Sequence, residues 1–217
     1  MEVFQILDHL RPTATGLDDL PAWFLHLAAP ILAAPLAELF NQSLAEGIVP
    51  RQWKTWVITP IPKVSKPVNP SDFRPISVTP ILSRVLERFI VQQYIYTAFH
   101  HQPPGLDFID QFAFRPSGST TATLVALFHR VRTMLLTNQF VHVYCFDFSK
   151  ASDTVRHYTL MDKMAQMQLT DNVYKWIIDF FWRPLSLHKV FSEVSAVAEV
   201  KASVIHGSGL GPASFTV

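Results

Sequence analysis

Asp147 is the residue whose type and position best suit catalysis. It ends an apolar, aromatic and β-branched run that starts at Val141, and apolar side chains occupy both faces of this run at the two-residue spacing of a strand. This pattern predicts a strand covered on both faces, inside a sheet. An unpaired buried carboxylate is costly, so Asp147 should have a partner. Two interpretations remain open: it caps the following element, or it binds Mg²⁺ in a phosphoryl-transfer site.

A glycine-rich stretch near the end of the sequence is the second candidate. Three of the seven glycines stand at Gly207, Gly209 and Gly211. Such a density indicates backbone that bends sharply or approaches a ligand closely. A tight turn before a helix would have the same composition.

Cationic residues gather between residues 51 and 90, where there are seven basic and two acidic residues, whereas residues 1–50 hold one basic and six acidic residues. Lys63, Lys66 and Arg74 lie in a proline-punctuated stretch, and a stiff backbone lowers the cost of presenting cations to a polyanion. A solvent-exposed loop with incidental charges is the alternative. Arg115 is a further candidate for a phosphate contact, weighed equally against a structural role on nearby carbonyl groups.

The hydrophobic pattern predicts mixed helices and strands around these candidates. An amphipathic helix is expected over 79–99, capped by Thr79, with Arg84, Glu87 and Arg88 between its apolar positions. Ser119 should cap another helix. The remaining expected elements are helices near 19–28, 31–46, 158–168 and 171–182, strands over 56–62 and within 188–206, and a turn over 102–107.

Composition and hydropathy exclude several classes of protein. A hydrophobic content of 49% and a charged content of 16% exclude a disordered tail. The single cysteine, Cys145, excludes a disulfide scaffold and fits a reducing compartment. Pro30, Pro35, His26 and Glu38 lie inside the apolar run over 21–40, which argues against a membrane helix. No secretory signal is found, so an intracellular location is expected, with the nucleus among the compartments that fit.

Five blocks resemble, in order, the motifs of reverse transcriptases of the non-LTR (LINE-like) retrotransposons. Residues 49–54 are similar to a V-P-x-x-W-K element, and residues 60–77 are similar to fingers motifs 1 and 2. Residues 111–122 resemble the Q-x-G-F-R block, residues 147–153 resemble motif A, and residues 207–212 resemble motif B. Each block is weak alone, and their order makes the set specific.

The resemblance implies an α+β fold: an incomplete right-hand polymerase with a helical lead-in over 1–50, a fingers-like region over 51–140 and a partial palm over 141–217. It implies an RNA-directed DNA polymerase that extends a DNA primer on an RNA template with dNTPs and Mg²⁺. Asp147 and the Phe148 carbonyl would bind the metal. Nucleotide and template contacts are implied for Lys63, Arg74, Arg115, Phe148, Ser152, His206, Gly207 and Ser208.

Three departures from the family pattern shape the functional expectation. The aromatic-Ala-Asp-Asp block is absent, so the 217-residue chain is expected to be inactive alone. Ser152 replaces an aromatic residue, which predicts poor discrimination against ribonucleotides in an active polymerase. His206 replaces a glutamine. The alternatives are a non-catalytic nucleic-acid-binding module, a decayed retroelement remnant, or an apolar helical interaction protein that uses residues 20–46.

Overall fold

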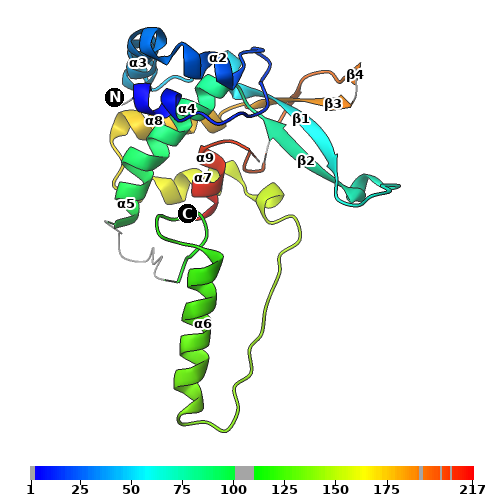
Figure 1. The fold of residues 1–217 in the computed structure, drawn as a ribbon. Coiled ribbons are helices and arrows are strands. Elements are labelled where there is room, and N and C mark those ends of the chain that lie inside the picture. The colour runs from blue at the N-terminus through cyan, green and yellow to red at the C-terminus, as the bar shows by residue number, and fades with distance from the viewer. Residues whose placement is uncertain (1–2, 101–109, 191–192, 201, 206) are drawn as a thin grey trace.

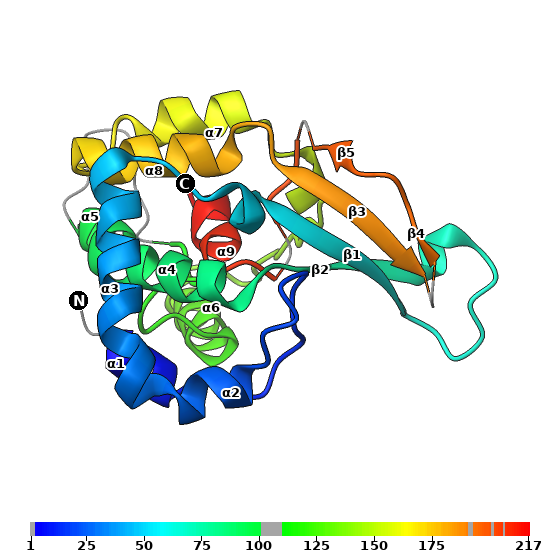
Figure 2. The same ribbon diagram turned by 90° about the horizontal axis from the view of Figure 1, so that it is seen from above.

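A computed structural model describes residues 3–100, 110–190, 193–200, 202–205 and 207–217. Helices form a body from which a mixed sheet extends (Figures 1 and 2), and the strand order in this sheet is β2 (Phe73–Val78), β1 (Thr55–Pro62), β3 (Leu185–Val190), β4 (Glu193–Val194). A short β5 (Ala198–Glu199) also pairs with β3. β1 runs antiparallel to β2 and parallel to β3, so the sheet joins residues far apart in the sequence (Figure 1). The expectation of mixed helices and strands is confirmed.

The prolines of β1 lie where the strand has one neighbour. Residues 55–58 of β1 pair with β3, whereas the half that contains Pro60 and Pro62 pairs only with β2. Pro60 stands directly opposite Pro75, so neither residue of this pair can donate a hydrogen bond. The expected strand over 56–62 is therefore confirmed, and its prolines lie in the half of the strand that has a single neighbour.

Most helices pack on one hydrophobic core (Figure 2). Phe40, Trp53, Trp176 and Phe180 are buried in it, and the Phe40 and Trp53 rings meet edge to face. The amphipathic helix expected over 79–99 is confirmed as α4, a π-helical turn over Val91–Ile95, and α5. The helices of this body are α1 (Val3–Asp8), α2 (Ala22–Leu27), α3 (Ala29–Glu46), α4 (Ile81–Ile90), α5 (Tyr96–His100), α7 (His157–Met164), α8 (Asp171–Phe181) and α9 (Leu210–Phe215).

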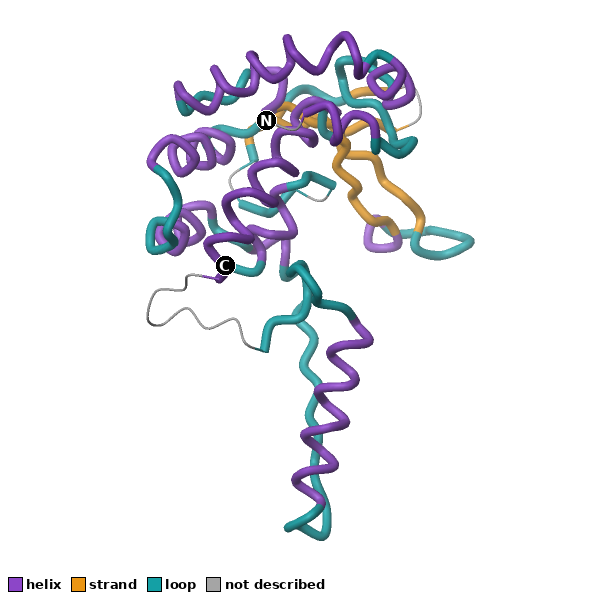
Figure 3. Tube along the Cα trace, turned by 60° about the vertical axis from the view of Figure 1, so that its left-hand side comes forward, coloured by secondary structure: helices purple, strands orange, loops and turns teal. Residues whose placement is uncertain are grey.

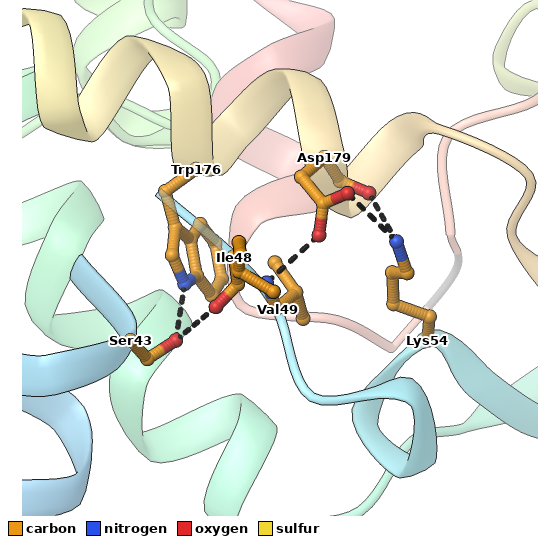
Figure 4. Close-up of polar contacts among 6 residues, drawn as sticks. All are labelled: Ser43, Ile48, Val49, Lys54, Trp176 and Asp179. Carbon is orange, nitrogen blue, oxygen red and sulfur yellow. Dashed lines mark hydrogen bonds and ion pairs between the residues drawn. The ribbon is translucent and has the colours of Figure 1, made fainter. Parts of the chain in front are cut away.

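A polar cluster joins the segment after α3 to α8 (Figure 4). The Asp179 carboxylate accepts a hydrogen bond of 2.8 Å from the Val49 amide and one of 3.0 Å from Lys54 Nζ. The Trp176 indole N–H donates to Ser43 Oγ at 2.9 Å, and this hydroxyl donates to the Ile48 carbonyl at 2.6 Å. The bonds made by Asp179 and Trp176 link α8 to residues 125 to 133 positions earlier in the sequence.

α6 (Thr120–Leu135) projects from the body, and the chain returns from its far end through irregular backbone (Figures 1 and 3). None of its residues is buried. The strand predicted over 141–148 is wrong: this stretch pairs with no strand in the described part of the chain, and Cys145 is exposed. A period-two pattern gives the two faces of a strand, but a strand also needs a hydrogen-bonded neighbour, which the local sequence cannot supply.

Some of the predicted helix caps are present in the structure, and one is not. Ser119 Oγ accepts a hydrogen bond from the Ala122 amide, as a helix cap should, and Gly47 ends α3 in the left-handed conformation. Thr79 does not cap α4: Pro80 takes that position, and the buried Thr79 hydroxyl has no hydrogen-bond partner among the described residues. The turn expected over 102–107 lies outside the described residues. Within the described residues, no helix combines the length and apolar character needed to cross a bilayer.

Candidate nucleotide and template site

Residues 207–211, here called the glycine loop, lie against β2 and α4. Gly207 has φ +103°, and a Cβ at this position would stand 2.3 Å from the Ser77 carbonyl oxygen of β2. A Cβ on Gly209 would stand 3.1 Å from both the Arg88 amide nitrogen and Glu87 Cβ. The glycines therefore allow close backbone packing on β2 and α4, and the expected close approach to a ligand stays a prediction.

A buried carboxylate holds the start of α9, whose first two residues belong to the glycine loop. Glu87 is fully buried, and its Oε2 accepts a hydrogen bond of 3.0 Å from the Leu210 amide. Burial raises the pKa of the Glu87 carboxyl above its ordinary value, while hydrogen bonds from Ser83, Leu210, Ser208 and Gly209 act in the opposite direction.

The turn that follows Asp147 is hydrogen-bonded to the segment that leads into the glycine loop. The Val204 amide donates to the Ser152 carbonyl at 3.0 Å, and the Ser203 amide donates to the Val155 carbonyl at 2.9 Å. Ser152 begins a single 3₁₀ turn over Ser152–Thr154. The structure thus brings the backbone of Ser152 to residues 202–205, which precede the glycine loop.

Asp147 and Phe148 lie in the exposed return from α6. The Phe148 side chain is 77% exposed, and the Asp147 side chain is also exposed, in contrast to the predicted buried strand end. Helix capping is not its role either, because Asp147 lies several residues before the 3₁₀ turn. Within the described residues, no group of three His, Cys, Asp or Glu side chains could hold a metal ion. Metal binding by Asp147 and the Phe148 carbonyl therefore stays a prediction.

Lys63 and Arg74 flank the β1–β2 hairpin, whose connecting turn includes a 3₁₀ turn over Pro70–Asp72. Lys63 Nζ donates to the Ser71 carbonyl at 2.9 Å, which holds this cation against the connecting turn. Amides of Asn69 and Val68 hold the pKa of Asp72 below its ordinary value, with a smaller contribution from Lys63. Arg74 pairs in register with Ile61 and is exposed to solvent.

Arg115 lies in the loop before α6. Its Nη1 donates to the Gln111 carbonyl at 3.4 Å, and the side chain is half-buried. This contact matches the structural alternative considered for Arg115. His206, another expected contact, lies outside the described residues. The structure therefore brings together Ser152, Gly207, Ser208 and the β2 strand that carries Arg74, while Asp147 and Arg115 stand on separate loops.

The family comparison accords with this order of segments. A family model described as reverse transcriptase (RNA-dependent DNA polymerase) matches residues 61–217. The chain belongs to the reverse transcriptase family. This match begins in β1 and includes the hairpin, the α6 arm, the Asp147 segment and the glycine loop.

Relatives of this reverse transcriptase chain are named for non-LTR mobile elements. The probable RNA-directed DNA polymerase from transposon X-element of Drosophila melanogaster is 31% identical over 179 residues, which cover 80% of this chain and 19% of the relative. The RNA-directed DNA polymerase from mobile element jockey of the same fly is 31% identical over 188 residues, which cover 84% of this chain and 20% of the relative. The RNA-directed DNA polymerase from mobile element jockey of Drosophila funebris is 28% identical over 219 residues, which cover 100% of this chain and 23% of the relative. The chain spans about a fifth of the length of these relatives.

The sequence interpretation missed two structural roles in this reverse transcriptase chain. Glu87 was expected between apolar helix positions, but it is buried and bonded to the Leu210 amide. Ser83 stands four residues earlier on the same helical face and donates to Glu87 Oε1 at 2.7 Å; this spacing indicates the Ser83 bond but not the contact with Leu210. The pairing of Lys54 with Asp179 joins residues 125 positions apart, and no local pattern indicates it.

Proposed function

We propose that this chain is the fingers region and first palm segment of an RNA-directed DNA polymerase that binds an RNA template, a DNA primer and incoming dNTPs. In this proposal residues 1–50 are a helical lead-in, residues 51–140 the fingers-like region and residues 141–217 part of the palm. Lys63 and Arg74 bind phosphate, while Ser152, His206, Gly207 and Ser208 lie beside the nucleotide and template.

One observation carries most of the support. Segments that the sequence places 50 residues apart, the turn at Ser152 and the residues before the glycine loop, are hydrogen-bonded to each other beside β2. Nucleotide selection in such a site needs a backbone that is held rigidly, because preorganised contacts reduce the cost of binding. The glycine loop has this property, since its close packing leaves little room for movement.

The test is binding of a fluorescently labelled RNA–DNA primer–template to the purified chain without added metal. We expect saturable binding that weakens when Arg74 is replaced by glutamine and is unchanged by Lys175→Gln, an exposed residue on α8. No binding by the wild-type chain, or equal effects of the two substitutions, would count against the proposal.

A second candidate, a non-catalytic nucleic-acid-binding module, is favoured by the exposed cations of the β1–β2 hairpin, which can bind phosphate without a catalytic group. Primer extension with Mg²⁺ and dNTPs separates the two candidates. The 217-residue chain contains no aromatic-Ala-Asp-Asp sequence, so we expect it to bind the primer–template without extending it. Measurable extension would refute this expectation and exclude the module.

A further inference from the structure

Glu87 presents hydrogen-bond acceptors to the glycine loop from inside the core. Its Oε2 accepts from the Leu210 amide at 3.0 Å, and its Oε1 accepts from the Ser83 hydroxyl at 2.7 Å. The Ser208 hydroxyl and the Gly209 amide are also hydrogen-bond partners of the carboxylate. Three consecutive residues of the loop therefore converge on one side chain of α4.

The Ser208 hydroxyl extends this network within the glycine loop. Its oxygen accepts a hydrogen bond of 2.7 Å from the Gly211 amide. A Cβ on Gly211 would stand 2.9 Å from this same oxygen, so the loop closes tightly around the hydroxyl. The loop conformation thus depends on polar contacts that end at the Glu87 carboxylate.

Salt bridging does not account for the burial of Glu87. In the described part of the chain it belongs to neither of the two ion pairs, Lys54–Asp179 and Arg130–Asp110. The Arg84 guanidinium lies within electrostatic range, but it donates to Thr13 Oγ1 and the Ala14 carbonyl instead. A buried carboxylate is compensated here by amides and hydroxyls, and most of these donors belong to the glycine loop.

We propose that Glu87 is a positioning residue that fixes the glycine loop in its nucleotide- and template-facing conformation. This inference rests on the proposed function of the loop. Glu87 touches neither template nor nucleotide in this proposal and acts only through residues 208–210. Its chemical contribution is a set of buried acceptors, so an apolar side chain of similar length would fill the space without holding the loop.

Two variants separate positioning from packing. Glu87→Met keeps the length of the side chain and removes both acceptors, whereas Glu87→Gln keeps one acceptor and offers a donor that the serine hydroxyls can accept. We expect hydrogen exchange of the amides at 209–211 to become at least about tenfold faster in Glu87→Met, the scale for loss of a hydrogen bond to a charged group. Glu87→Gln should retain most of the protection. Glu38→Met, an exposed position on α3, is the matched control and should change nothing.

Binding of the RNA–DNA primer–template is measured on the same proteins. Glu87→Met should weaken it several-fold, and Glu87→Gln should restore most of the affinity. Exchange at 209–211 that is unchanged in Glu87→Met would overturn the proposal, as would equal exchange in the Met and Gln variants. Should Glu87→Met fail to fold, Glu87→Asp retains the charge but withdraws the acceptors by one methylene, and unchanged loop exchange in that variant would overturn the proposal too.

The two measurements also separate this inference from the proposed function. Faster loop exchange with no primer–template binding by any protein, wild type included, supports the coupling of Glu87 to the loop and contradicts the proposed function. Normal binding with unchanged loop exchange supports the function and contradicts the role of Glu87.

Discussion

Glu87 makes the stability of this chain depend on pH in a defined direction. Burial raises its pKa above the ordinary value of 4.5, so the folded protein holds a proton at pH values where the unfolded chain has lost it. The free energy of unfolding therefore falls as the pH rises through the raised pKa, and the ionised carboxylate lowers the stability at neutral pH. Arg84 and Arg88 are the other charged side chains of this part of α4, and the glycine loop offers only neutral donors.

Glu87→Gln tests whether ionisation of Glu87 lowers the stability as the pH rises, because the amide side chain cannot ionise. We expect its free energy of unfolding to exceed that of the wild type at neutral pH, with the difference shrinking as the pH falls toward 4.5. Urea unfolding at several pH values measures both quantities. A wild type that is the more stable protein at neutral pH would show that the loop hydrogen bonds outweigh burial.

Asp179 should contribute more to stability than an exposed ion pair would. Its carboxylate accepts the Val49 amide in addition to Lys54, and the Lys54 side chain is 15% exposed. We expect Asp179→Ala to lower the free energy of unfolding by about 1–3 kcal/mol, since it removes acceptors from a partly buried amide and ammonium group. Lys54→Met should cost less, because it leaves the Val49 contact in place. Equal losses in the two variants would show that the ion pair alone matters.

At the scale of elements, Gly47 ends α3 in a conformation that other residues adopt with strain. Its φ is +66°, and an added Cβ would lie 2.8 Å from Cβ of Lys175 on α8. Gly47→Ala should therefore lower the free energy of unfolding by about 1–2 kcal/mol from backbone strain, plus the cost of displacing Lys175. Thermal unfolding measures this loss, and Glu46→Ala on the exposed side of the same helix end should leave the midpoint unchanged.

Elements with local signals were predictable from the sequence, and those that depend on distant partners were not. α4 and α8 follow from apolar residues at helical spacing, and the end of α3 follows from Gly47. Pairing of β1 with β3 joins residues 55–58 to residues 185–188, which no local pattern specifies. The same limit explains the wrong prediction over 141–148, where the pattern of a strand exists without a paired neighbour in the described chain. Likewise, the sequence motifs identified the glycine loop but gave no indication of its contact with Glu87.

Substitutions in the segment that returns from α6 test whether residues 141–148 are exposed and do not form a buried strand. Phe140 is 69% exposed and Phe146 is 85% exposed. We expect Phe140→Ser with Phe146→Ser to leave the unfolding midpoint unchanged and to reduce self-association, because apolar surface is lost without loss of core contacts. Phe180→Ser, within the core, should instead prevent stable folding. A clear drop in the midpoint of the double variant would show that these side chains are packed in solution.

At the scale of the whole molecule, the distribution of charge matters more than its sum. The chain has a formal net charge of +1, yet residues 51–90 hold seven basic residues against two acidic ones, and residues 1–50 are acidic. A protein of net charge +1 whose charges were evenly distributed would bind nucleic acid weakly. A local concentration of cations, in contrast, can bind phosphates and release counterions. Lys63, Lys66 and Arg74 are all exposed and lie on or beside the β1–β2 hairpin, which projects from the body (Figure 1).

Replacement of Lys63, Lys66 and Arg74 by glutamine should therefore reduce both RNA affinity and its dependence on salt. Each lost phosphate contact lowers the slope of log K against log salt by about 0.7 for a single strand, so the triple variant should lose roughly two units of slope. Arg132, Lys175 and Arg183 are exposed at other places and provide a control with the same change in net charge. Equal slopes in the two triple variants would mean that net charge, and not the hairpin, governs binding. A slope lost only in the hairpin variant would place the RNA backbone along β1 and β2, on the strand whose Ser77 carbonyl supports Gly207.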